Sequence, residues 1–224
     1  MPVPQRIQRP RHPQRGCRGT ARDAPVEGRA QVAVVFETVL ARDGAVHRLG
    51  AHLDRLLRSL AAIGMRPPHD RDGFAKIVEE TVTRNDLRDA YVKLIVTRGS
   101  NGTPLLDPAG CVPTVICLAR PHTDDDPARL ARIERGLTAK TTAVRRPPAD
   151  VLDPRIKSLN YLNLVLARIE ARAAGADEVF LCSTAIGLIP VVVVDGRTIG
   201  IGRSGPVTTD LLTTYLAALR EENA

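Results

Sequence analysis

The sequence predicts an α+β fold, and three observations lead to this expectation. Short apolar runs bounded by turn residues are typical of strands, and apolar residues at helical spacing mark several amphipathic helices. The Asp-Gly pairs at 43–44 and 195–196 are strong signals for tight turns between strands. Hairpins with flanking helices are typical of α+β architecture. The chain has 224 residues, which is enough for one large domain or two small ones.

The first half of the chain is predicted to start with a strand hairpin closed by Asp43-Gly44. The two segments that follow carry apolar residues on one face, and Gly64 ends the first of them. The elements predicted here are strands at 32–40 and 46–49, helices at 51–64 and 70–84, and strands at 90–97 and 113–119.

The second half opens with a Pro/Asp-rich loop at 121–127. A long helix with an apolar face should end at Gly175, and Pro206 suits the first turn of a last helix. The elements predicted here are a strand at 133–144, a helix at 158–174, strands at 179–182 and 189–194, and a helix at 206–221.

The N-terminal 31 residues differ in composition from the rest of the chain. They hold seven arginines against Asp23 and Glu27, which accounts for five of the net +7 charges. We expect a basic, disordered tail, with an arm for RNA, DNA or anionic lipid as the alternative. Because the remainder is nearly neutral, we expect no nucleic-acid partner for the folded part.

Other features narrow the class of protein. No apolar run approaches the roughly 20 residues that span a bilayer, and the N-terminus has no apolar leader, so we expect a cytoplasmic protein without a membrane partner. The four cysteines form no C-x-x-C pair, and the five histidines have no ligand spacing. We therefore expect no metal site. The sequence also lacks a nucleotide-binding glycine loop and a G-x-S-x-G turn.

Several short motifs follow one another along the chain in a fixed order. The most informative is the stretch Ile156–Asn163, with Lys157 near its start. The others are Val35–Val39, His52–Leu56, Gly175–Asp177, Phe180–Ala185 and Gly205–Thr208. Together they resemble the class IV (fold-type IV) pyridoxal-phosphate-dependent aminotransferases, and the resemblance is nearest to branched-chain and D-amino-acid transaminases and to aminodeoxychorismate lyase.

The resemblance implies roles for particular residues around pyridoxal 5'-phosphate. Lys157 matches the lysine that anchors the cofactor, although from the residues alone it would be a surface lysine at a helix start. Arg55 matches the arginine that holds the phosphate, which a planar guanidinium binds through two parallel donors. Tyr161 matches a tyrosine near the phenolic oxygen. Ser183 and Thr184 match a turn that also binds phosphate.

Two further residues are assigned to the substrate by the same resemblance. Phe36 would line the substrate pocket, and Arg98 lies where some members bind the substrate carboxylate. The implied reaction moves an amino group between a branched-chain-like amino acid and a 2-oxo acid. The implied assembly is a homodimer.

The implied architecture is a two-domain fold-type IV arrangement with a shortened second domain. The predicted divisions are the tail 1–31, an N-terminal α/β domain 32–120, a linker 121–127 and a C-terminal cofactor domain 128–224. Glu178 leads directly into Val179 and the family's last motifs, so we expect that a central segment is deleted. That segment normally supplies an acid to the pyridine nitrogen, and its loss would impair activity.

Two other functions stay open from the sequence. The missing acid favours a non-catalytic or degenerate family member. Lys157 and Arg55 also fit a lyase of the aminodeoxychorismate type.

Overall fold

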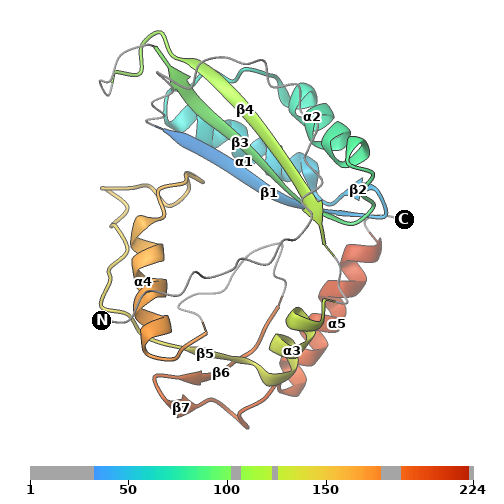
Figure 1. Cartoon of the computed structure of the whole chain (residues 1–224), viewed down its shortest axis with the longest axis vertical. Helices are drawn as coiled ribbons and strands as arrows, with labels where there is room; N and C mark the ends of the chain where they lie inside the picture. The colour runs from blue at the N-terminus through green and yellow to red at the C-terminus, as the bar shows by residue number, and fades with distance from the viewer. Residues whose placement is uncertain (1–32, 102–106, 123–125, 178–187, 222–224) are drawn as a thin grey trace, which may run out of the picture.

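The computed structural model describes residues 33–101, 107–122, 126–177 and 188–221 (Figure 1). Helices and strands alternate irregularly, as expected for a mixed α+β chain. The elements are β1 Val34–Arg42, β2 Ala45–Val46, α1 Leu49–Ala62, α2 Arg71–Arg84, β3 Ala90–Ser100, β4 Val112–Pro121, α3 Pro127–Arg135, β5 Leu137–Ala139, α4 Leu162–Ala173, β6 Val191–Val194, β7 Arg197–Thr198 and α5 Pro206–Glu221.

The first sheet is antiparallel and has the strand order β2-β1-β3-β4. Helices α1 and α2 cover one of its faces (Figure 1). The main apolar core lies between these helices and the sheet, where Leu53, Leu56 and Phe74 are fully buried. Asp70 caps α2 by accepting a hydrogen bond from Gly73 N at 2.8 Å. The predicted strands and helices of this half are therefore confirmed with small shifts of their ends.

The predicted hairpin at Asp43-Gly44 is confirmed, but its return strand is shorter than expected. Both turn residues have positive φ angles of 49° and 86°, as a type I′ turn requires. The return strand β2 covers only Ala45–Val46, because Leu49 already begins α1.

Gly99 lies at an irregularity in the β3–β4 register, between Thr97 and Ser100. Its φ is 78°, and a Cβ there would overlap the backbone carbonyl of Val112. We expect Gly99→Ala to lower the free energy of unfolding by about 3 kcal/mol. The strain of a positive φ at alanine and the clash of its Cβ with the Val112 carbonyl both destabilise the folded state. Gly205→Ala is the matched control, since no atom lies within 4 Å of a Cβ at that position. Equal denaturation midpoints for the two variants in urea would contradict the expectation.

The second sheet has the order β5-β6-β7, with β5 parallel to β6 and β6 antiparallel to β7. The predicted strand at 133–144 is wrong over its first part. Pro127 begins helix α3, and Leu130 and Ile133 share a helical spacing of three residues. Only the three residues of β5 form a strand in this segment.

Helix α4 begins four residues later than predicted. The preceding backbone pairs with β1 instead: Phe36 N donates to Lys157 O at 3.0 Å, and Leu159 N donates to Val34 O at 3.2 Å. The apolar face of α4 is exposed, and the residues that it buries are Ala167 and Ala171. The exposed apolar side chains are Leu162, Val165, Leu166 and Ile169.

Asp177 connects the end of α4 to α3 and β5. Its oxygens accept two bonds from Arg135 at 2.7 and 2.8 Å and one from Thr138 N at 3.0 Å. The Arg135 guanidinium lowers the pKa of Asp177 from 3.8 to about 2. A lowered pKa stabilises the folded state above pH 3.8, and this contribution is lost as pH falls through about 2.

We expect Asp177→Asn to lower the free energy of unfolding at pH 7 by about 1 kcal/mol, a value reduced for solvent screening. The difference from the wild type should disappear when urea unfolding is repeated near the folded-state pKa. A destabilisation that is equal at both pH values would contradict this account.

Some predictions fall outside the described residues: the basic tail, the strand at 179–182, the phosphate turn Ser183-Thr184 and the proposed junction after Glu178. No helix in the described ranges is both long and apolar enough to cross a membrane.

Candidate active site

The segment that carries Lys157 is fixed to the edge of β1 and to α1. In addition to the two backbone bonds with β1, Lys157 N donates to the Ser59 hydroxyl at 3.2 Å. An isolated bridge joins Ser158 to Val35. Because its backbone is held on both sides, the Lys157 side chain has a defined starting point and direction.

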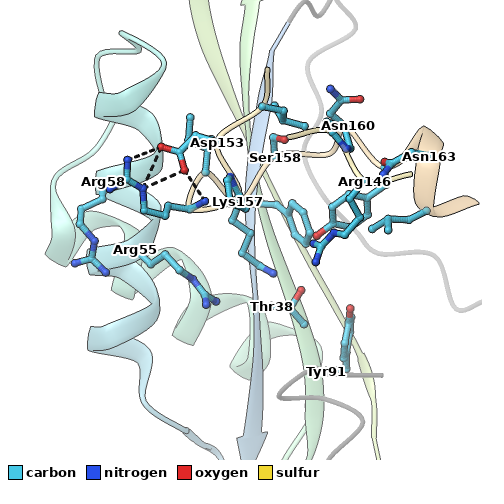
Figure 2. A pocket seen from close by; sticks show the side chains of 18 residues that line it. Thr38, Arg55, Arg58, Tyr91, Arg146, Asp153, Lys157, Ser158, Asn160 and Asn163 are labelled. Atoms are coloured by element: carbon cyan, nitrogen blue, oxygen red, sulfur yellow. Dashed lines mark hydrogen bonds and ion pairs between the residues drawn. The ribbon is translucent and has the colours of Figure 1, made fainter. Parts of the chain in front are cut away.

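Lys157 lines a cavity of about 900 Å³ together with Phe36, Arg55 and Tyr161. These residues come from β1, α1 and the segment before α4, which are far apart in the sequence. Figure 2 shows the Lys157 and Arg55 side chains reaching toward the same region, near Thr38. Four of the residues singled out in the sequence therefore meet in one cavity.

The Lys157 amine lies in a half-buried, cationic surrounding. It is 4.6 Å from the centroid of the Phe36 ring, and the amine of Lys93 is 4.7 Å from the same centroid. Burial is the largest cause that lowers the pKa of Lys157, and the charges of Arg55 and Lys93 lower it further. The carboxylate of Glu37 opposes this change. A lowered pKa increases the fraction of neutral, nucleophilic amine at a given pH.

Arg55 is held by the buried carboxylate of Glu37. Its Nε donates to Glu37 Oε1 and its Nη2 to Glu37 Oε2, both at 2.6 Å. His52 Nδ1 lies 2.8 Å from the same Glu37 Oε2. Burial acts to raise the pKa of Glu37, but the bonds from Arg55 and His52 outweigh it and the pKa is lowered. Glu37 is therefore an ionised carboxylate at neutral pH.

Tyr161 and Phe36 form the aromatic wall of the cavity. Their ring centroids are 5.8 Å apart with an interplanar angle of 79°, which is a favourable edge-to-face arrangement. Burial raises the pKa of Tyr161, so its hydroxyl is a neutral hydrogen-bond donor at neutral pH.

The rest of the cavity wall is rich in arginine. Arg58, Arg146 and Arg155 line it, and Asp153 is the only carboxylate among its described lining residues. Asp153 is itself paired with Arg155 Nη2 at 2.7 Å, and the dashed lines in Figure 2 mark its contacts. The excess of positive charge favours an anionic ligand.

Residues 34–191 match the family model described as amino-transferase class IV. The chain belongs to this family. Similar relatives include a candidate branched-chain-amino-acid aminotransferase of Methanocaldococcus jannaschii, 47% identical over 148 residues, which are 66% of this chain and 49% of the relative. A chloroplastic D-amino-acid transaminase of Arabidopsis thaliana is 32% identical, over 63% of this chain and 36% of the relative.

The fold is also that of solved branched-chain amino acid aminotransferases. One such crystal structure, with pyridoxamine 5'-phosphate, has a TM-score of 0.77 at 22% identity, covering 86% of this chain and 87% of the other. The enzyme from Thermoproteus uzoniensis with norvaline has a TM-score of 0.73 at 22% identity, covering 85% and 86%. A mutant of the Thermobaculum terrenum enzyme has a TM-score of 0.74 at 22% identity, covering 86% of each chain. In sequence, the chain spans about half the length of the first curated relative.

Arg98 is the predicted site residue that this class IV aminotransferase structure places elsewhere. It is buried, its guanidinium donates to the carbonyl of Ile63, and its backbone N donates to Ala33 O at 2.8 Å. It does not line the cavity of Lys157. This placement gives no support to a substrate-binding role, which stays an untested prediction.

Glu37 is one of the residues near the site whose role was not predicted from the sequence. It lies between Val35 and Val39 on the helix-facing side of β1, with an exposed fraction of 1%. A single acid within a mostly apolar strand was the signal available in the sequence, since buried carboxylates require partners.

Proposed function

We propose that this class IV aminotransferase moves an amino group from a branched-chain-like amino acid to a 2-oxo acid with pyridoxal 5'-phosphate. The observation that carries the proposal is the half-buried Lys157 amine in a cationic cavity beside Arg55. When bound, the cofactor withdraws electrons from the substrate Cα. The protein has to hold it, exclude water and move a proton.

The residues in the cavity fit the aldehyde and the phosphate group of that cofactor. The Lys157 amine, with its lowered pKa, is suited to bind an aldehyde carbon covalently and, when released, to accept a proton. A guanidinium has five N–H donors, and the two bonds to Glu37 leave the outer edge of Arg55 available for a phosphate. Tyr161 adds a neutral hydroxyl donor at the cavity wall.

The character of the walls supports an amino acid with an apolar side chain. Phe36, Leu152, Ile156 and Leu164 contribute apolar surface to the cavity. The arginines that line the same space offer charge to a carboxylate. The names of the similar proteins support the same substrate class, because most concern branched-chain amino acids.

We include slow turnover in this proposal. The acid that the cofactor's ring nitrogen requires is not supplied by the described cavity wall, because Asp153 is engaged by Arg155. Without that acid the ring is a weaker electron sink. Binding of the cofactor would then be retained while amino transfer is slower than in longer relatives.

The organisation of the whole protein is also proposed. The boundary of the two domains is placed at 121–127, with a shortened second domain after it, and the assembly is a homodimer in the cytoplasm. These points rest on the resemblance to longer members of the family. Light scattering that gives the mass of one chain at all concentrations would overturn the dimer.

A direct assay tests the reaction. The purified protein, pyridoxal phosphate, leucine and 2-oxoglutarate are incubated, and the 2-oxo acid formed from leucine is measured by mass spectrometry. The proposal expects product that requires both added substrates. Release of pyruvate from an aminodeoxychorismate-type substrate, without formation of the 2-oxo acid of leucine, would favour the lyase alternative. No product from either substrate would favour a non-catalytic protein.

A further inference from the structure

Glu37 is a buried charged residue on a strand whose neighbouring residues belong to the apolar core. Its side chain lies on the helix-facing side of β1, in line with the core residues Val35 and Val39. Placing a carboxylate in such a position costs free energy unless partners bind it on its polar sides. Here Arg55 binds it through two bonds and His52 through a third. The free-energy cost of burying this carboxylate points to a role other than packing.

The pairing fixes which part of Arg55 can meet a ligand. Glu37 accepts from Nε and Nη2, and Nη2 also lies 3.4 Å from His52 Nδ1, so Nη1 is the nitrogen that remains on the outer edge. The Arg55 side chain is 42% exposed and lines the cavity, so this edge is the part that can reach a ligand there. Without Glu37, a long arginine side chain would sample many rotamers.

We propose that Glu37 is the positioning residue of this site: it orients the outer edge of Arg55 toward the anionic group of a cavity ligand and supplies the negative charge that offsets the cations around the Lys157 amine. The identity of the ligand, pyridoxal phosphate, rests on the proposed function. The positioning itself rests on the Glu37–Arg55–His52 contacts.

The consequence for Lys157 follows from the charges that act on its amine. Within the described ranges they are Glu37, Arg55 and Lys93, and of these three only Glu37 raises the pKa of Lys157. Removing the Glu37 charge leaves the two cations unopposed, so the pKa of Lys157 falls. At a fixed pH below that pKa, a larger fraction of the amine is neutral and reacts with an electrophile.

The first test uses the protein without cofactor. The labelling rate of Lys157 by trinitrobenzenesulfonate is measured by peptide mass spectrometry across pH for wild type, Glu37→Gln and Glu80→Gln. We expect the curve of labelling rate against pH to move to lower pH in Glu37→Gln alone. Below the midpoint of that curve, Lys157 should be labelled on the order of fivefold faster than in the wild type. Glu80 is a matched control, because it pairs with Arg84 on the exposed face of α2.

A second variant keeps the test valid if Glu37→Gln folds poorly. Glu37→Asp retains the charge, so its profile should stay near that of the wild type although the bonds to Arg55 are altered. A Glu37→Gln profile identical to wild type, or a Glu37→Asp profile moved as far as that of Glu37→Gln, would overturn the proposal.

The second test concerns Arg55. Glu37→Gln should weaken binding of pyridoxal phosphate about tenfold more than binding of pyridoxal, which lacks the phosphate. In an Arg55→Ala background the same substitution should have no further effect on this ratio. The proposal would be overturned if Glu37→Gln weakened the binding of pyridoxal phosphate and of pyridoxal equally. It would also be overturned if Glu37→Gln changed the ratio of the two affinities further in the Arg55→Ala background. If wild type binds no pyridoxal phosphate, the proposed function fails, and the labelling profile still decides the role of Glu37.

Discussion

Replacing Lys157 by alanine is expected to lower the rate of amino transfer by about 10³-fold, the range in which loss of a positioned nucleophile and proton carrier usually falls. The backbone of Lys157 is bonded to β1 and to the Ser59 hydroxyl, so the place from which its side chain enters the cavity is fixed. Lys93 approaches the same Phe36 ring but comes from β3. The fold should be unaffected, because the Lys157 side chain ends in the cavity.

The assay compares Lys157→Ala with Lys76→Ala, a change in an exposed lysine of α2. Both variants should unfold at the same urea concentration as the wild type, and only Lys157→Ala should lose activity. A Lys157→Ala protein that keeps most of the wild-type rate would remove Lys157 from the reaction.

Replacing Arg55 by alanine is expected to weaken pyridoxal phosphate binding about 10- to 100-fold, since charge-assisted bonds to a phosphate are lost. A second effect follows from the core. Among the described residues, the buried Glu37 would keep only His52 as a side-chain partner, so the free energy of unfolding should fall by about 2 kcal/mol. The two effects arise from opposite edges of one guanidinium.

Arg71→Ala is the control for Arg55→Ala, because Arg71 forms a half-exposed pair with Asp54 at 2.9 Å. Exposed pairs contribute little, so this variant should change neither cofactor affinity nor stability appreciably. Calorimetric titration and urea unfolding measure the two quantities. Unchanged cofactor affinity in Arg55→Ala would show that the phosphate is bound elsewhere.

The first half of the fold could be predicted well because its patterns are local. The hairpin follows from the turn chemistry of Asp43-Gly44, and α1 follows from leucines that recur at helical spacing. The elements of the second half are less evident from the sequence. The segment after Pro127 is short and mostly polar, so its helix spacing was weak, and the start of α4 depends on pairing with distant β1.

The same distinction applies to the site. Lys157, Arg55, Tyr161 and Phe36 were found through family motifs, and the cavity brings all four together. The role of Glu37 could not be found in this way, because it depends on two residues of α1 that the fold places beside β1. Residue types and spacing show that a buried acid needs partners, but they do not say which ones.

The most direct test of the central claim, that this chain binds pyridoxal phosphate through Lys157, is a titration of purified wild type with the cofactor. Absorbance is followed at visible wavelengths, and the sample is then reduced with borohydride and mapped by peptide mass spectrometry. We expect a saturable absorbance band and a cofactor mass on the peptide that contains Lys157. No band at saturating cofactor, or the mass on another lysine, would contradict it.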